Sequence, residues 1–250
     1  MKTNKITNDF LGFTRSKMGF RTSELARDMI NGRGGFRGGY MNPYILEESD
    51  QHLMTIDCFS KLLQSRIIFF GTEVNPDTAN ILVSQLLYLD SVSEDEIKIY
   101  LNSPGGSITD GCSILDTMDF IKAPVSTLCT GMAASFGAVI LAYGEKGKRS
   151  ILPRGRVMIH QPRGGAQGTS SDIQIEAKLI NDMKEELTRV LAEKTGQSYD
   201  KIWKDTELDY WMNSKEALEY GMVDNIITPS RDSIESKKET RKRTIKKDKK

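Results

Sequence analysis

The stretch Thr130-Gly-Met-Ala-Ala-Ser135-Phe-Gly-Ala138 lies between two apolar runs, Val125–Cys129 and Val139–Ala142. This pattern predicts a strand that turns into a helix, with Ser135 at the turn. The first backbone N–H groups of a helix have no partner within it, so they can hold an anion or a developing oxyanion. Serine is also a common N-cap residue. A capping role and a catalytic role for Ser135 therefore both stay open.

Strands and helices alternate on either side of this stretch. Further strands are predicted near residues 66–71, 97–101 and 156–160. Helices are predicted over 76–89, 107–120 and 214–220, the last with Asn213 as its cap and Gly221 at its end. Alternation at such short intervals indicates an α/β fold of βαβ units with a largely parallel sheet. Ligands bind such sheets at the carboxyl ends of the strands. The loops at 102–106 and 130–135 are both expected at that edge.

A long amphipathic helix is predicted to follow the run Ser171-Asp-Ile-Gln174, which has the hydroxyl and glutamine spacing of a capping box. The helix should end near Thr195. Its apolar stripe is long for a small sheet domain. Two explanations stay open: the stripe packs on its own domain, or it contacts another subunit.

Composition excludes several classes of protein. The 250 residues carry 35 Lys and Arg against 34 Asp and Glu, so overall charge does not favour nucleic-acid binding. Three cysteines without a C-x-x-C motif favour reduced thiols. We expect no metal site, no membrane span, since no apolar run approaches ~20 residues, and no phosphate-binding P-loop, since Gly144–Ser150 lacks its glycine spacing.

Both ends of the chain differ from its middle. Up to Leu46 there are eight Lys or Arg and three Asp or Glu, and residues 32–39 have the composition of a flexible linker. From Arg231 to Lys250 there are ten basic and four acidic residues, which predicts a disordered tail. We therefore divide the chain into an N-terminal extension or propeptide (1–41), a catalytic domain (42–228) and a basic tail (229–250).

A base and an acid for Ser135 can be proposed from the sequence. His160 ends a predicted strand, and Asp172 follows at the head of the long helix. A serine hydroxyl needs an imidazole to accept its proton, and a carboxylate can fix the tautomer of that imidazole. Each residue also has a simpler explanation, since a core histidine can satisfy a local hydrogen bond and an acid suits a helix N-terminus.

Several long motifs, in order, resemble the proteolytic subunits of ATP-dependent Clp proteases. They are Asn102–Ser107, Gly131–Gly137, Gly147–Ser150, Arg156–Pro162 and Ser171–Gln174. The resemblance extends from about Asn42 to Thr228. The runs Asn42–Glu47 and Asp209-Tyr-Trp-Met212 are similar to the forms found in Bacteroidetes bacteria.

The resemblance implies a ClpP/crotonase-type spiral of ββα units with a protruding helix–strand handle at about 163–195. It implies a serine endopeptidase, the chamber subunit that cleaves unfolded proteins to small peptides. Ser135 would be the nucleophile, His160 the base and Asp172 the orienting acid. The N–H groups of Gly106 and Phe136 would form the oxyanion hole, and a peptide would pair with the segment Arg163, Gly164, Gly165 and Ala166.

The partners implied by the resemblance are other copies of the chain, in two stacked heptameric rings, and a hexameric AAA+ unfoldase of the ClpX or ClpA/ClpC type. ATP would be used by that unfoldase, so no cofactor is expected in this chain. A cytoplasmic location is expected, and nucleic acid is not an expected partner. Two alternatives remain: a catalytically silent ring subunit, or a crotonase-type acyl-CoA enzyme.

Overall fold

The computed structural model describes residues 44–49 and 52–228. The chain divides into two units, with the boundary between Cys58 and Phe59. In the first unit, β1 (Tyr44–Ser49) and β2 (His52–Asp57) pair antiparallel, with Ser49 opposite His52. The second unit contains the sheet and the helices that follow. The predicted extension at 1–41 and the predicted tail at 229–250 lie outside the described residues.

The second unit is built on a seven-stranded, mainly parallel sheet, which confirms the predicted α/β fold. Its strands are β3 (Ile67–Phe70), β4 (Ile97–Ser103), β5 (Val125–Ala134), β6 (Arg149–Ile151), β7 (Arg156–Ile159), β8 (Tyr210–Asn213) and β9 (Asn225–Ile226). Alternate residues of β4 are buried, and Ile97, Ile99 and Leu101 are fully enclosed. This alternation is the period of two that a strand requires.

The long strand β5 has two successive neighbours on one side. Its first half pairs with β6, from Thr127 to Cys129, and its second half pairs with β7, from Met132 to Ala134. Strand β8 then runs antiparallel to β7. The carboxyl ends of β4, β5 and β7 are thereby brought to one region of the sheet, as the sequence predicts for the loops that follow β4 and β5.

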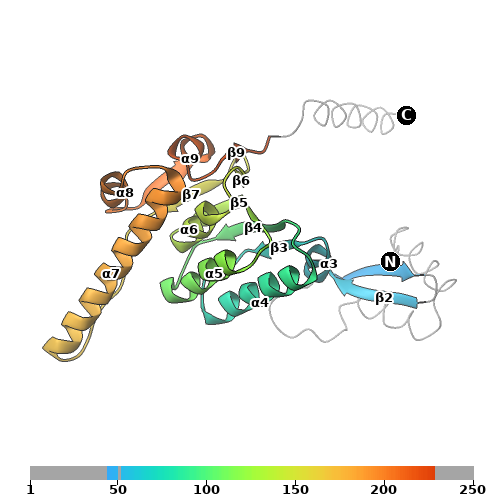
Figure 1. Cartoon of the computed structure of the whole chain (residues 1–250), viewed down its shortest axis with the longest axis horizontal. Helices are drawn as coiled ribbons and strands as arrows, with labels where there is room; N and C mark the ends of the chain where they lie inside the picture. Colours follow the sequence, from blue (N-terminus) through green and yellow to red (C-terminus); the bar gives the residue numbers. More distant parts are fainter. Residues whose placement is uncertain (1–43, 50–51, 229–250) are drawn as a thin grey trace, which may run out of the picture. The chain divides into compact units, whose positions relative to one another are not determined.

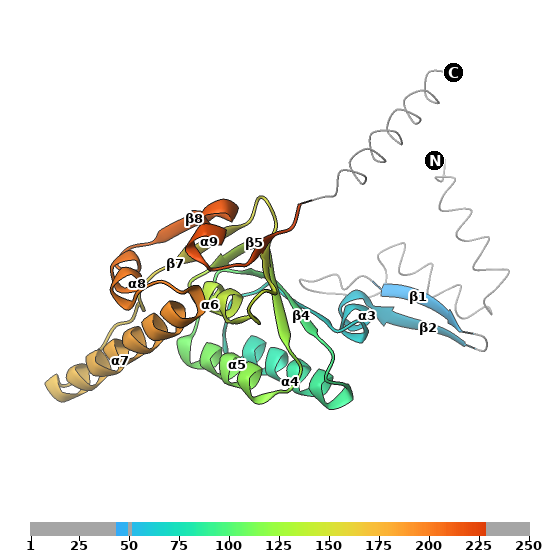
Figure 2. The ribbon, with the colours of Figure 1, turned by 45° about the horizontal axis from the view of Figure 1, so that its top comes forward.

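The helices that accompany this sheet lie in the second unit, except that α3 begins at Cys58, the last residue of the first unit. They are α3 (Cys58–Gln64), α4 (Pro76–Val92), α5 (Ile108–Phe120), α6 (Phe136–Tyr143), α7 (Ser170–Thr195), α8 (Tyr199–Asp205) and α9 (Ser214–Tyr220). Figures 1 and 2 show α4 and α5 side by side, while α7 extends away from the sheet. All residues of α6 from Phe136 to Ala142 are buried, so α6 is the central helix of the core.

The beginning of α7 differs from the sequence prediction. The N-cap is Thr169, whose side chain accepts a hydrogen bond from the N–H of Asp172, and the Asp172 side chain accepts one from the N–H of Thr169. The predicted capping box at Ser171–Gln174 is therefore wrong by two residues. An aspartate can fill the third helical position as glutamate or glutamine does, because its carboxylate also reaches the N-cap N–H.

Candidate active site

Ser135 lies at the turn between β5 and α6, as predicted. Its backbone has φ 54° and ψ −126°, a left-handed conformation that is strained for a residue other than glycine. The turn is held by the N–H of Ser135, which donates to the carbonyl of Met158 over 2.9 Å, and by the carbonyl of Ser135, which accepts from Ala138 over 2.9 Å. Such a sharp strand-to-helix turn carries the nucleophile in other hydrolases.

The Ser135 hydroxyl forms no capping hydrogen bond with α6. Its Oγ instead lies 2.8 Å from Nε2 of His160. His160 directly follows β7, and the β5–β7 pair places Ala134 opposite Met158. Ser135 lies one residue beyond Ala134, and His160 lies two residues beyond Met158. Both therefore lie just past the end of the β5–β7 pair, at the ends of neighbouring strands. The hydroxyl is therefore hydrogen-bonded to an imidazole and does not cap the helix.

The acid beside His160 is Asp209, which the sequence analysis does not identify as a site residue. Its Oδ1 lies 3.2 Å from Nδ1 of His160. The antiparallel register pairs Ile159 of β7 with Tyr210 of β8, so the residue after Ile159 and the residue before Tyr210 face each other. An aromatic and apolar run, Tyr210-Trp-Met212, just before the predicted cap Asn213 was the available signal for a strand beginning beside an acid.

The prediction that Asp172 orients His160 is not met in this structure. Asp172 is exposed in the first turn of α7, where Oδ2 accepts hydrogen bonds from the N–H and the Oγ1 of Thr169, over 2.9 and 2.7 Å. The Thr169 side chain, and then its backbone N–H, lower the pKa of this carboxyl group. Asp172 thus has the simpler role considered from the sequence, as an acid at a helix N-terminus.

Gly106 and Phe136 line the same cavity as Ser135. Gly106 has φ 148°, and a Cβ atom there would lie 2.1 Å from the carbonyl oxygen of Val74, so only glycine fits. Its neighbour Gly105 approaches the turn itself, since a Cβ atom on it would lie 2.7 Å from the backbone nitrogen of Phe136. Phe136 opens α6, where its N–H has no partner within the helix. Both predicted oxyanion donors therefore border the nucleophile.

A cavity of about 350 Å³ opens beside Ser135 and His160. It is bordered by Gly106, by Phe136 and by Arg163. Its apolar wall comes from α5, α6 and the base of α7, and comprises Ile108, Val139, Met183, Leu187 and Leu191. A larger cavity of about 470 Å³ lies among the ends of α5, α6 and α7. Its lining brings no serine or cysteine together with a histidine, so the smaller cavity is the candidate active site.

The predicted peptide-binding segment begins at this cavity. Arg163 borders it, and Gly164, Gly165 and Ala166 continue from there as exposed chain. Residues 161–167 belong to neither helix nor strand. The segment is therefore a loop and not an edge strand.

Lys184 of α7 contacts the two chain segments that carry His160 and Asp209. Its ammonium group lies 2.8 Å from Oε1 of Gln161 and 3.4 Å from Oε2 of Glu207. The Lys184 side chain is only 12% exposed, and its ammonium lies 4.0 Å from the centre of the Trp203 ring. Lys184 of α7 therefore contacts both the segment that follows His160 and the segment that precedes Asp209.

The His160 environment favours the neutral imidazole. Burial first, and then the nearby Arg163 guanidinium, lower the pKa of His160, while the Asp209 carboxylate acts in the opposite direction. A neutral imidazole at neutral pH is the form that can accept the proton of a serine hydroxyl.

Residues 44–49 and 52–228 contain neither a metal-binding cluster nor a membrane-spanning helix. In these ranges no three His, Cys, Asp or Glu side chains are placed to hold a metal ion. The helices of the same ranges include none with the length and apolar character to cross a membrane.

Comparison with known proteins identifies the family of the chain. The family model described as Clp protease matches residues 49–230. An ATP-dependent Clp protease proteolytic subunit of Bacteroides fragilis is 55% identical over 192 residues, which cover 76% of this chain and 93% of the relative. A second, from B. fragilis strain YCH46, is 50% identical over 221 residues, covering 88% and 98%.

A third such subunit, from Bacteroides thetaiotaomicron, is 54% identical over 192 residues, which cover 76% of this chain and 87% of the relative. The resemblance found in the sequence, including its Bacteroidetes character, is confirmed, and neither the silent subunit nor the crotonase-type enzyme is favoured. The chain therefore belongs to the Clp protease family and is a serine-type endopeptidase.

Proposed function

We propose that Ser135, His160 and Asp209 are the catalytic triad of this endopeptidase. The observation that supports the proposal best is the 2.8 Å contact between Ser135 Oγ and His160 Nε2, made by a serine that leaves its own helix uncapped. Asp209 takes the place that the sequence analysis gives to Asp172, because it lies at Nδ1 of the imidazole.

The chemistry follows from these positions. Oγ of Ser135 attacks the carbonyl carbon of the scissile peptide bond while Nε2 of His160 accepts its proton. The imidazolium then donates that proton to the leaving amine, and the resulting acyl-enzyme is hydrolysed by water that His160 deprotonates. Asp209 stabilises the imidazolium in both steps. The N–H groups of Gly106 and Phe136 are the proposed donors to the oxyanion.

A peptide substrate is proposed to extend along Arg163, Gly164, Gly165 and Ala166. An exposed backbone outside any strand can pair with an extended peptide through main-chain hydrogen bonds, which do not depend on the peptide sequence. The apolar wall of the adjoining cavity is suited to an apolar side chain of that peptide. This combination fits unfolded polypeptides as a substrate class.

The assembly is also part of the proposal. Members of this family form oligomeric proteases that work with Clp ATPases, and the relatives above are named ATP-dependent. We expect two stacked heptameric rings in the cytoplasm and a hexameric AAA+ unfoldase that uses the ATP. The apolar side chains exposed on the outer part of α7, Ile173, Ile175 and Leu179, support a contact between copies of the chain.

Covalent labelling tests the proposed nucleophile. A fluorophosphonate probe should label the wild-type protein on the peptide that contains Ser135, as located by mass spectrometry, because the reagent reacts only with a serine activated by a base. The variant Ser135→Ala should remain unlabelled. Ser84→Ala is the matched control, since this exposed serine of α4 donates its hydroxyl to the carbonyl of Asn80 and does not line the active-site cavity.

The labelling is measured with and without a Clp ATPase, because a resting protease can hold its catalytic groups out of alignment. Labelling of Ser84→Ala should match that of the wild type. An assembled wild-type protein that stays unlabelled under both conditions, or a label at another serine, would overturn the assignment of Ser135.

A further inference from the structure

One carboxylate oxygen in the site has two competing partners. Oδ1 of Asp209 lies 2.5 Å from Nη2 of Arg163 and 3.2 Å from Nδ1 of His160. Among the described residues, the buried Nδ1 atom has no hydrogen-bond partner of acceptable geometry. The shorter contact of Asp209 is therefore with the guanidinium, and its contact with the imidazole has the distance of an ion pair without the alignment of a hydrogen bond.

Arg163 and Asp209 have opposite effects on the proton transfer. His160 must become an imidazolium when it accepts the Ser135 proton, and a carboxylate stabilises that cation. A guanidinium nearby disfavours a second positive charge, and a charge-assisted hydrogen bond to Oδ1 draws the carboxylate away from Nδ1. Arg163 thus weakens the help that Asp209 gives to the base. The other charged groups in this region, the Lys184 ammonium and the Glu207 carboxylate, contact each other rather than the imidazole, and Lys184 also donates to Gln161.

Arg163 is placed where a substrate would meet it. Its side chain is 70% exposed, it borders the active-site cavity, and it begins the exposed segment that is proposed to pair with a peptide. An exposed ion pair contributes little free energy, so a bound peptide can displace the guanidinium from Asp209 at small cost.

We propose that Arg163 is a positioning residue, which keeps Asp209 out of hydrogen-bond alignment with His160 in the free protein and releases it when a peptide occupies the segment from Arg163 to Ala166. The proposal rests on the triad proposed above. It makes the Asp209–His160 contact, and with it the strength of the base, depend on whether the peptide-binding segment is filled.

The variant Arg163→Gln tests this role. Without the guanidinium, the pKa of His160 should rise, so the acidic limb of the profile of kcat/KM against pH should move to higher pH. On the alkaline plateau kcat should increase by about two- to fivefold, the range expected for an exposed ion pair. The labelling rate with a small fluorophosphonate should increase in the same way, because that probe is too short to displace Arg163.

Two variants serve as controls. Arg163→Lys retains the positive charge and should keep the acidic limb near its wild-type position. Arg189→Gln removes an exposed arginine of α7 that pairs with Glu185 over 2.7 Å and has no role in the site, so its profile should equal that of the wild type.

The outcomes separate this inference from the proposed function. An Arg163→Gln profile and labelling rate equal to those of the wild type would overturn the role of Arg163 while leaving the triad intact. A lower plateau in kcat would also overturn it, since Arg163 would then support Asp209. A wild-type protein without labelling or hydrolysis would instead refute the triad itself.

Discussion

Asp209→Asn is expected to lower kcat/KM for a short fluorogenic peptide by about 10³- to 10⁴-fold, as the loss of the orienting carboxylate does in other serine proteases. An amide at this position can donate a hydrogen bond to Nδ1 and so favour the wrong tautomer of His160. It also removes the charge that stabilises the imidazolium. Because the effect is on the chemical step, kcat should fall much more than KM changes.

The matched control is Asp172→Asn, the same substitution at the acid that the sequence analysis favours. Asp172 bonds to Thr169 at the start of α7, so kcat/KM should stay within about twofold of the wild-type value, as for most exposed substitutions. Circular dichroism and the mass of the assembly confirm that both variants fold. A large loss in Asp172→Asn with little change in Asp209→Asn would restore the original assignment.

The contrast between these two acids marks the limit of what the sequence could predict. Ser135 and His160 follow strands with clear apolar patterns, and parallel strands end at a common edge, so their proximity follows from the order of elements. Asp209 depends on the register of β8, a four-residue strand that pairs antiparallel with β7. A strand of four residues shows too little alternation of apolar and polar residues to be recognised in the sequence, and its register is set by tertiary contacts.

Among the helices too, those with clear local sequence signals were predictable and those without them were not. The helix at Ser214–Tyr220, with its cap Asn213 and its terminal Gly221, is found as predicted, because capping residues act locally. The short helix α8 (Tyr199–Asp205) was not predicted, since seven residues carry too little periodicity to be distinguished from a loop. Yet α8 and β8 together carry Asp209 to His160, so the missed elements decide the identity of the acid.

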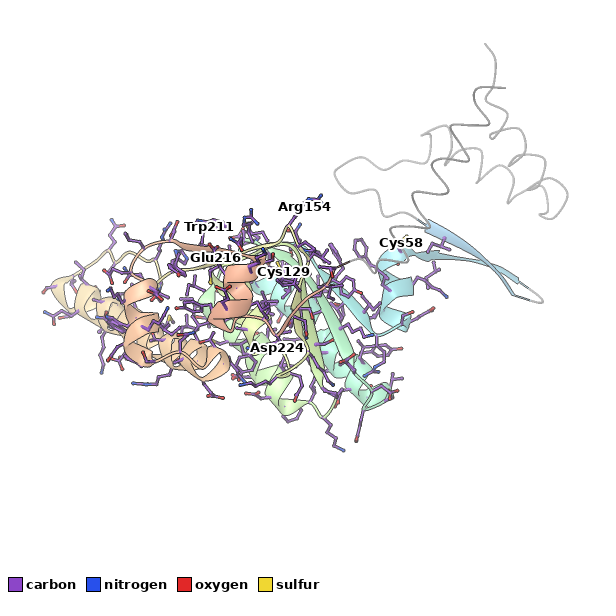
Figure 3. The ribbon with its side chains drawn as sticks, turned by 90° about the horizontal axis from the view of Figure 1, so that it is seen from above. Cys58, Cys129, Arg154, Trp211, Glu216 and Asp224 are labelled. Atoms are coloured by element: carbon purple, nitrogen blue, oxygen red, sulfur yellow. The ribbon has the colours of Figure 1, made fainter. Side chains whose placement is uncertain are left out.

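A second large effect is expected at the ion pair of Arg149 and Asp224, neither of which lines the active-site cavity. The Arg149 side chain is 3% exposed and contacts Asp224 through two hydrogen bonds, of 2.9 and 2.6 Å. It also donates to the carbonyl groups of Ala142 and Lys194, over 3.2 and 2.6 Å. Arg149 thus joins the start of β6 to the ends of α6 and α7. Asp224, which is labelled in Figure 3, directly precedes β9 in the chain.

Arg149→Met should lower the free energy of unfolding by about 3–5 kcal/mol, because the substitution leaves the Asp224 carboxylate without its buried partner. Urea unfolding at a fixed protomer concentration measures the change, since assembly also contributes to stability. The control Arg189→Met breaks an exposed pair with Glu185 and should cost about 0.3–0.5 kcal/mol. Equal losses in the two variants would contradict a stabilising role for burial and geometry at Arg149.

The same pair should make stability depend on pH. Burial opposes ionisation of Asp224, but the hydrogen bonds and the charge of Arg149 outweigh it and lower the pKa of the carboxyl group. A carboxyl group whose pKa is lower in the folded protein adds stability above its unfolded pKa of ~3.9 and loses it as pH falls through the folded value. The wild-type protein should therefore lose stability relative to Arg149→Met below about pH 4. A difference between the two proteins that stays constant from pH 7 down to acid unfolding would show that Asp224 is not stabilised as an anion.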